Sequence, residues 1–188
     1  MRSLAVMLLI AVSTGPAFSG TITFNGIGGV NGDPFTTYVE SGFTVTPTTG
    51  IWKKGFGFGN PVPSIFSPSA TASITVTGGT FDLISFDFGN ANNLSGLTWS
   101  AAGFLNNVQV LSGSGNGPST VMFITVPSPN SAALLDTLVL TGNLGNTSSY
   151  NFDNIVLSSV PEPSTITFFA MGLVLAGFCR RRSNGLNR

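Results

Sequence analysis

Residues 21 to 160 alternate between short runs of β-branched and aromatic residues and turns rich in Gly, Pro, Asn and Ser. Such runs form strands, and closely spaced turns between them are typical of a sandwich or barrel. No segment between the two ends of the chain combines a helical period with caps. We therefore expect an all-β fold in which two antiparallel sheets share one core. The predicted strands are Thr21–Phe24, Phe43–Thr46, Ala72–Thr77, Phe81–Phe88, Leu97–Ser100, Val108–Leu111, Val121–Val126, Leu135–Leu140 and Asn151–Leu157.

Charged residues are few, and most of the cations lie at the two ends of the chain. Arg2 lies at the N-terminus, and four arginines lie in the last nine residues. Between residues 21 and 160, only Lys53 and Lys54 oppose six carboxylates, which gives this part a net charge of −4. Nucleic-acid binding needs a basic patch that displaces phosphate counterions. The charge pattern therefore argues against nucleic acid as a partner.

The chain has no histidine and one cysteine, Cys179. These counts exclude the usual Ser-His-Asp and Cys-His nucleophiles and argue against a zinc site. Two carboxylates can cleave glycosides, but Asp82 and Asp87 are five residues apart and face opposite sides of a strand. Asp136 and Asp153 would have to meet in space. We expect no enzyme, and a domain held by its core alone without disulfides.

The first 19 residues have the three parts of a secretory signal peptide. Arg2 supplies the positive region, Leu4–Val12 the apolar region, and Ala17 and Ser19 the small residues that signal peptidase requires. Nine apolar residues are too few to span a bilayer, so an uncleaved anchor is the weaker alternative. We expect cleavage after Ser19 and export of residues 20–159.

The C-terminal segment, residues 160–188, contains an uncharged stretch at Thr165–Cys179 followed by Arg180, Arg181 and Arg182. As a helix, the stretch would extend about 22 Å, and arginine side chains that reach the headgroups would help it span the ~30 Å hydrocarbon core. Arginines mark the cytoplasmic side, so the N-terminal domain would lie outside, as the signal peptide also predicts. A buried core helix is the alternative, but it gives no reason for the arginines.

The order Pro161-Glu162-Pro163, hydrophobic helix and basic cluster resembles the PEP-CTERM sorting signal of exported Gram-negative proteins. The same tail is also called the ice-binding protein C-terminal domain. The resemblance implies membrane retention and processing by an exosortase near the motif, with delivery to the cell surface or an exopolysaccharide matrix. The two prolines fit this role, because they keep the backbone extended and accessible.

Three stretches resemble the jelly-roll domains that are common in PEP-CTERM proteins. They are TITFNGIGG at residues 21–29, FDLISFDFGNANN at residues 81–93 and YNFDNIVL at residues 150–157. The resemblance implies that the exported domain is a jelly-roll-like sandwich.

Side-chain oxygens follow the strand that ends near residue 88. Asp87, Asn90 and Asn92, with Asp153 from the last predicted strand, are oxygen ligands of the kind that Ca²⁺ prefers. They are candidate ligands of a structural Ca²⁺. An ordinary Asn/Gly turn is the favoured interpretation, because this stretch holds a single carboxylate.

The glycine-rich segment 51–60 contains Trp52, Phe56 and Phe58. Exposed aromatic rings stack on pyranose rings in sugar-binding modules, and Lys53 and Lys54 would suit an anionic polysaccharide. In the alternative, these rings fold back over the core.

Two function classes remain. In the first, the exported β-domain is structural cargo at the cell surface or in the extracellular matrix, and it needs no cofactor. In the second, it is a carbohydrate-binding module for exopolysaccharide. Exposure of Trp52, Phe56 and Phe58 on one face would favour the second class, and their burial would favour the first.

Overall fold

The computed structural model describes residues 19–93, 95–145 and 148–159, and every regular element in these ranges is a β-strand. The expected all-β architecture is confirmed, and all strand pairs are antiparallel. The strands are β1 Ser19–Ile22, β2 Tyr38–Glu40, β3 Phe43–Thr49, β4 Lys53–Gly55, β5 Ser64–Ser67, β6 Thr71–Asn90, β7 Thr98–Leu105, β8 Val108–Asn116, β9 Met122–Pro127, β10 Leu135–Asn143 and β11 Tyr150–Ser159.

The eleven strands form one hydrogen-bonded sheet whose longest path is β4-β5-β11-β6-β10-β7-β8. The 20-residue β6 joins the two parts of this sheet. Its first part, Thr71–Thr77, lies between β3 and β10, and its second part, Phe81–Asn90, lies between β9 and β11. The sequence predicted two separate sheets, and the structure has a single sheet because β6 passes from one part to the other.

The passage occurs at Gly78 and Gly79, which have φ angles of +149° and +63°. Residues with a side chain rarely adopt these backbone conformations. In addition, a Cβ at Gly78 would lie 2.7 Å from the carbonyl oxygen of Gly42. The pairing with β10 is also irregular here, between Leu135 and Thr137. The prediction that Ala72–Thr77 and Phe81–Phe88 are separate strands is therefore wrong, because the glycines redirect the strand without ending it.

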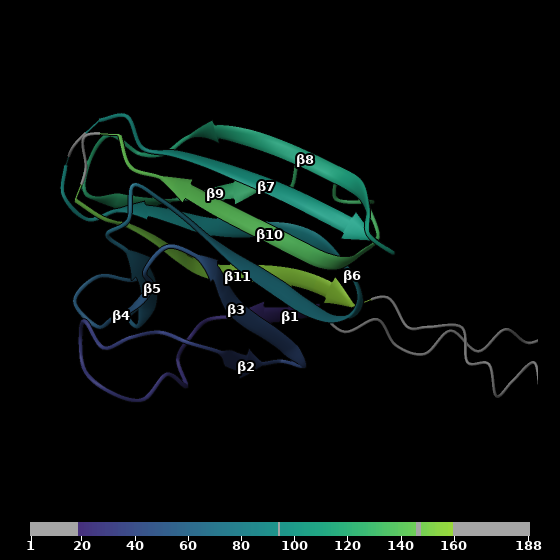
Figure 1. The fold of residues 1–188 in the computed structure, drawn as a ribbon, viewed down its shortest axis with the longest axis horizontal. Coiled ribbons are helices and arrows are strands. Elements are labelled where there is room, and N and C mark those ends of the chain that lie inside the picture. The colour runs from purple at the N-terminus through teal and green to yellow at the C-terminus, as the bar shows by residue number, and fades with distance from the viewer. Residues whose placement is uncertain (1–18, 94, 146–147, 160–188) are drawn as a thin grey trace, which may run out of the picture. The chain divides into compact units, whose positions relative to one another are not determined.

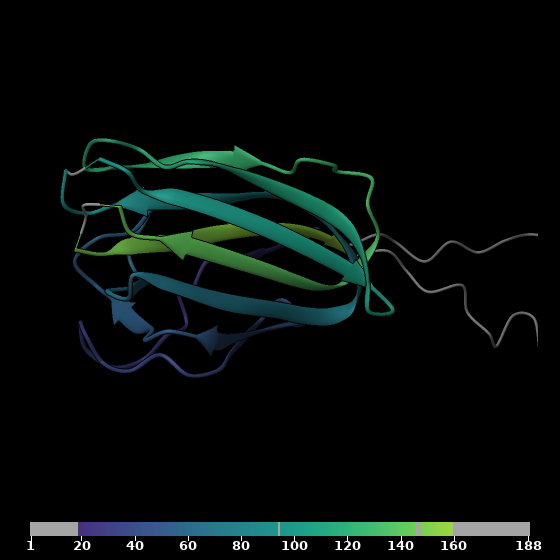
Figure 2. The same cartoon turned by 45° about the horizontal axis from the view of Figure 1, so that its top comes forward.

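The sheet is folded so that its two parts face each other as two layers (Figures 1 and 2). The first layer contains β2, β3, β10, β7, β8 and the first part of β6; the second contains β1, β4, β5, β9, β11 and the second part of β6. Phe86 and Trp99 connect the layers, with ring centroids 5.4 Å apart. Such contacts make the arrangement a β-sandwich with one shared core.

Aromatic rings dominate the end of the core near β5 and β11. Phe88 and Phe152 lie 5.0 Å apart on neighbouring strands, and Trp52 stacks on Phe152 at 5.8 Å. Phe86, Phe88, Tyr150 and Phe152 are fully buried. Because side chains alternate across a strand, the residues between them, Asp87 and Asn151, point to the outer face of the second layer.

All nine predicted strands overlap observed strands, with ends displaced by several residues. The sequence missed β2, β4 and β5. These strands have only three or four residues, too few to show a period, and β4 is the polar segment Lys-Lys-Gly. β4 and β5 hold the two ends of a loop that covers the outer face of the second layer.

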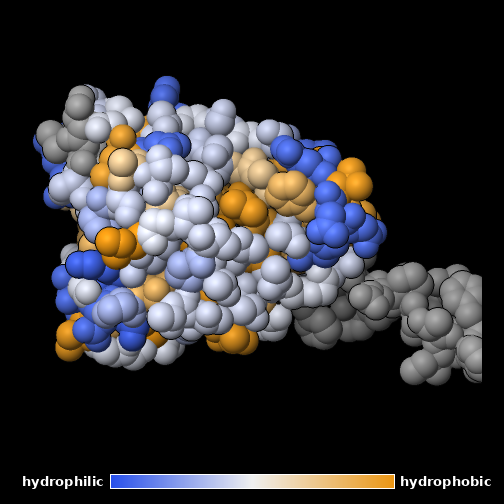
Figure 3. Space-filling model, viewed as in Figure 1, coloured by the Kyte–Doolittle hydropathy of each residue, from blue (hydrophilic) through white to orange (hydrophobic). Residues whose placement is uncertain are grey.

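The predicted signal peptide up to residue 18, the PEP motif, the predicted helix 165–179 and the arginines at 180–182 lie outside the described residues. Within the described ranges, no helix is long and apolar enough to cross a membrane. On the face shown in Figure 3, hydrophobic residues are scattered among weakly polar ones and do not gather in one large patch.

Candidate functional site

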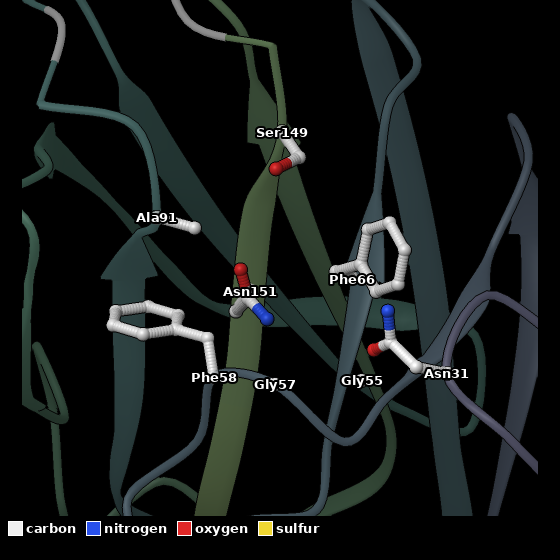
Figure 4. A pocket seen from close by; sticks show the side chains of 8 residues that line it. All are labelled: Asn31, Gly55, Gly57, Phe58, Phe66, Ala91, Ser149 and Asn151. Carbon is white, nitrogen blue, oxygen red and sulfur yellow. The ribbon is translucent and has the colours of Figure 1, made fainter.

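A pocket of about 160 Å³ opens on the outer face of the second layer, where the β4–β5 loop meets β5 and β11 (Figure 4). Its lining combines aromatic rings, carboxamides, a hydroxyl and glycine backbone. No titratable side chain lines it. The lining residues are Asn31, Gly55, Gly57, Phe58, Phe66, Ala91, Ser149 and Asn151.

Asn151 and Phe66 are directly paired residues of β11 and β5. Asn151 is 2% exposed, and its Oδ1 has no hydrogen-bond partner among the described residues. Less than 1 Å² of this oxygen is accessible, so it is a buried acceptor without a partner beneath the pocket surface, an arrangement that is uncommon for a buried polar atom.

Phe58 and Phe66 lie on either side of Asn151 (Figure 4). Phe58 stacks on Phe123 of β9, with centroids 4.7 Å apart and an interplanar angle of 21°. Phe123 in turn covers Gly89 of β6, where a Cβ would lie 2.6 Å from the ring. Stacking on Phe123 therefore holds the ring of Phe58 in place at one side of the pocket.

Trp52, predicted as part of an exposed aromatic platform, is 3% exposed. Its indole N–H donates to the carbonyl oxygens of Thr49 and Ser73, at 3.2 and 3.1 Å. Phe56 is half-buried and packs against the core. Of the three predicted rings, Phe58 alone lines the pocket. The three rings therefore form no common exposed face, and the burial of Trp52 agrees with the alternative in which this segment folds back over the core.

The residues predicted to bind Ca²⁺ separate into two groups. Asp87 and Asp153 are directly paired on β6 and β11. Asn90 instead donates from Nδ2 to the carbonyl oxygen of Pro118 at 2.9 Å and accepts from the backbone N–H of Asn92 at 3.0 Å. Asn92 donates to Ser149 Oγ at 3.0 Å. Asn90 and Asn92 thus form the kind of turn given as the alternative to a cation site.

Both oxygens of each buried carboxylate accept hydrogen bonds from the protein. Asp87 accepts from Thr125 at 2.7 Å on Oδ1 and from the side chains of Asn60 and Asn154, at 3.0 and 2.8 Å, on Oδ2. Asp153 accepts from the backbone N–H groups of Asn60 and Asn154, at 2.7 and 2.8 Å. Within the described ranges, no three carboxylate, histidine or cysteine side chains are grouped to hold a metal ion.

The pKa of Asp153 is raised to about 7, chiefly because burial removes its carboxyl group from water. The hydrogen bonds from Asn60 and Asn154 oppose the rise, and the negative charges of Asp87 and Glu40 add to it. The pair is covered by Asn60 of the β4–β5 loop and does not line the pocket. It therefore has no direct access to a molecule bound there.

Asp136, the other carboxylate considered for a catalytic pair with Asp153, lies on β10. Its Oδ2 accepts from the N–H of Asn106 at 2.6 Å, and its Oδ1 accepts from Thr137 at 2.9 Å. It shares no hydrogen-bond partner with Asp153.

Sequence reasoning did not select Asn31, Phe66 or Asn151. Asn151 could have been found from the alternation in YNFDNIVL, because Tyr150 and Phe152 carry the apolar face and Asn151 the other. What no pattern reveals is that the β4–β5 loop folds over this outer face and buries the asparagine.

The described residues define an all-β domain with a small, uncharged pocket. A profile of the PEP-CTERM protein-sorting motif matches residues 159–183, which include Pro161, Glu162, Pro163 and the arginines at 180–182. The chain is therefore a PEP-CTERM sorting domain-containing protein. This signal implies an exported, membrane-associated protein that an exosortase processes.

No curated protein sequence matches the chain. Several solved structures resemble its fold. The K1 cleaved adhesin domain of Lys-gingipain from Porphyromonas gingivalis W83 is 9% identical, with a TM-score of 0.47, and the match covers 78% of this chain and 100% of that one. The enzymatically active domain of bacteriophage CBA120 tailspike protein 4 is 17% identical, with a TM-score of 0.39 and coverage of 64% and 20%. TmCBM61, solved with beta-1,4-galactotriose, is 8% identical, with a TM-score of 0.39 and coverage of 62% and 88%. At these identities and TM-scores, the likenesses carry no functional information.

Proposed function

We propose that this protein is cargo for the cell surface or extracellular matrix, retained in the membrane by its PEP-CTERM signal until an exosortase processes it. The position of the signal carries the proposal. The match begins at residue 159, and the last strand, β11, ends at Ser159. A cut between Pro161 and Ser164 would leave all eleven strands in the released part.

The proposed topology places the β-domain on the outer, periplasmic side of the inner membrane. Signal peptidase removes residues 1–19, the helix at Thr165–Cys179 holds the precursor in the membrane, and the arginines at 180–182 stay in the cytoplasm. After processing, the domain, which we describe as a jelly-roll-like sandwich, reaches the cell surface or an exopolysaccharide matrix.

A structural rather than enzymatic role agrees with the carboxylates. Asp87 and Asp153 accept hydrogen bonds on every oxygen and lie beneath the β4–β5 loop. A glycosidase pair needs both carboxyl groups beside an open substrate site. Their placement therefore supports non-enzymatic cargo.

The test is the intact mass of the protein recovered from the outside of its native cells, compared with that from a strain lacking the exosortase. We expect native material to end between Pro161 and Ser164 and the mutant strain to retain Arg188. The variant Glu162→Ala/Pro163→Ala should also retain the tail, whereas Arg188→Ala, outside the matched motif, should be processed normally.

Retention of residue 188 in both strains would overturn the proposal, because the tail would then be a permanent anchor. Processing in the strain without exosortase would assign the cut to another protease, and would also overturn it.

A second candidate function, carbohydrate binding, is favoured by one observation. The pocket combines two aromatic side chains with carboxamides and has no charged lining residue. This combination is suited to a sugar, whose ring has apolar faces and polar edges.

A further inference from the structure

The chain carries no charged residue between Asp87 and Asp136, a stretch that contains β7, β8 and β9. Among the described residues, β8 is an edge strand of the first layer and β9 an edge strand of the second. The two lie at the same side of the sandwich, because residues 117–121 alone join them. A Cβ at Gly113 of β8 would also meet the side chain of Pro129, just beyond β9. One side of the domain therefore presents two uncharged edge strands.

The backbone of β8 is open to another strand. Its nine residues pair with β7 on one side, and no described strand pairs with it on the other. On such an edge, alternate residues point their N–H and C=O groups outward. The register with β7 is irregular near Phe104 and then continuous from Leu111 to Asn116. Gln109 Nε2 donates to the carbonyl oxygen of Leu111 at 3.3 Å, a long hydrogen bond that an incoming strand can replace.

The other edge strands carry protection that β8 lacks. Natural sheets protect their edges with short strands, charges and prolines. β2 and β4 have three residues each and contain Glu40, Lys53 and Lys54, and β1 has four residues. β9 has six residues and ends in Pro127. With nine residues, no charge and no proline, β8 is the edge that obstructs a further strand least.

Exposed apolar side chains lie on and near this edge. Val108 of β8 is 63% exposed, and Val110 is exposed beside it. Val121 and Met122, where β9 begins, are exposed as well. A pair of strands alone buries little surface, whereas stable protein interfaces bury at least about 1,000 Å². These side chains would supply apolar contact around a strand that pairs with β8.

The sequence of β8 is compatible with a copy of itself. In an antiparallel pair about a two-fold axis at Gly113, Ser112 of each copy lies opposite Ser114 of the other. Hydroxyl side chains directly opposite each other across strands are favourable. Like charges in these positions would be unfavourable, but β8 has no charge. Self-pairing of β8 therefore brings together compatible side chains.

We infer that two copies of this chain pair through β8, antiparallel about a two-fold axis near Gly113, so that their first layers form one continuous sheet. A second copy is the partner that fits, because a charged partner would find no opposite charge along residues 88–135. The inference goes beyond the proposed function. It names a partner for the cargo domain, and it depends on neither the sorting signal nor the pocket.

The experiment uses the full chain in detergent. Sedimentation velocity at several concentrations gives its mass after the bound detergent is subtracted. We expect a dimer that dissociates on dilution. Ser112→Lys/Ser114→Lys places lysines opposite lysines in the pair and should raise the dissociation constant by roughly fivefold or more. Both serines are exposed, so the variant should keep the far-UV circular dichroism spectrum of the parent.

Thr75→Lys/Thr77→Lys is the matched control. Thr75 and Ser112 share the outer face of the first layer, because strand pairing connects them through Val139 and Ala102. The two threonines lie on β6, between β3 and β10, and not at an edge. The control adds the same charge at the same spacing, so its dissociation constant should match that of the parent.

Cross-linking locates the contact. Cys179→Ser removes the one cysteine of the chain, and Ser112→Cys in this background places a single thiol on β8. In the proposed pair, the two introduced thiols occupy diagonal positions about 7–8 Å apart. A short bismaleimide should therefore give a covalent dimer. Thr77→Cys in the same background should give none.

A monomer at every concentration would overturn the inference and leave the edge to water or to a different protein. A dimer whose dissociation constant is unchanged in Ser112→Lys/Ser114→Lys, and which gives no cross-link from residue 112, would also overturn it and assign the association to another part of the chain. Neither outcome alters the mass of the processed protein, so the sorting proposal is tested separately.

Discussion

The ring of Tyr150 on β11 lies directly against the backbone of Gly142 on β10, at a point where the two layers meet. A Cβ at position 142 would clash with three ring atoms of Tyr150. The Tyr150 hydroxyl donates to the carbonyl oxygen of Ala72 at 3.3 Å, and Ala72 is the residue paired with Gly142. One side chain thus fastens β11 to two neighbouring strands of the opposite layer.

Gly142→Ala should therefore destabilise the domain by about 3 kcal/mol or more, because the overpacked methyl group can be accommodated only if the layers separate. Urea unfolding followed by far-UV circular dichroism measures the change. Gly28→Ala is the matched control, since a Cβ there meets nothing within 4 Å, and it should change stability by less than about 0.5 kcal/mol. Equal stabilities of the two variants would contradict the close packing of Tyr150 on Gly142.

The buried carboxyl group of Asp153 should make stability depend on pH. Its pKa is raised from 3.8 to about 7, so the folded protein keeps a proton that the unfolded chain has already released. Between about pH 4 and pH 7, the folded state binds more protons, and the free energy of unfolding should fall as pH rises. This contribution is fully present below about pH 4 and lost above about pH 7.

Asp153→Asn removes this titration, so its stability curve should be flatter than that of the parent protein over the same range. Asp136→Asn makes the same substitution on β10, at a carboxylate that shares no hydrogen-bond partner with Asp153, and controls for the general effect of the Asp-to-Asn change. Denaturant unfolding at several pH values from about 4 to 8 tests both. The contrary result would be a parent protein whose free energy of unfolding rises between about pH 4 and about pH 7 when compared with that of Asp153→Asn. It would contradict a buried carboxyl group that is protonated in the folded state.

Asn154 has a φ of +41° and donates from its side chain to Asp87 and to the carbonyl oxygen of Asn60. Asn154→Gly keeps the backbone conformation and loses the hydrogen bonds, at a cost of about 1 kcal/mol. Asn154→Ala should cost about 1 kcal/mol more, because alanine is strained at positive φ. Thermal unfolding of Asn154→Gly and Asn154→Ala separates the loss of the hydrogen bonds from the strain of the backbone. An alanine variant as stable as the glycine variant would show that position 154 imposes no backbone strain.

The fold was largely predictable because long runs such as FDLISFDF carry a strand signal that tertiary context does not reverse. The continuity of β6 was not predictable. A Gly78-Gly79 pair is typical of a turn, and only pairing of its two parts with β10 and β11 shows that the strand continues.

The candidate site was less predictable than the fold. Asp87 and Asp153 are 66 residues apart, and strand register alone makes them neighbours. Of the predicted aromatic residues, Phe58 lines the pocket and Trp52 is buried in the core, and a glycine-rich segment gives no sign of which ring turns inward. The indole N–H of Trp52 donates to two backbone carbonyl oxygens, those of Thr49 and Ser73, and sequence does not reveal such partners.

Trp52→Phe distinguishes a core residue from a binding residue. Phenylalanine keeps an aromatic ring beside Phe152 but leaves the carbonyl oxygens of Thr49 and Ser73 without the indole donor. We expect a loss of about 1 kcal/mol in the free energy of unfolding, because the Ser73 carbonyl loses the indole donor while Thr48 Oγ1 still donates to it at 3.2 Å. Glycoside binding by the folded variant should match that of the parent, since Trp52 does not line the pocket.

Phe66→Ala should show the reverse, with weak binding and a smaller loss of stability. If Trp52→Phe abolished binding and kept full stability, Trp52 would be a ligand-stacking residue, and the pocket lined by Phe58 and Phe66 would not be the saccharide site.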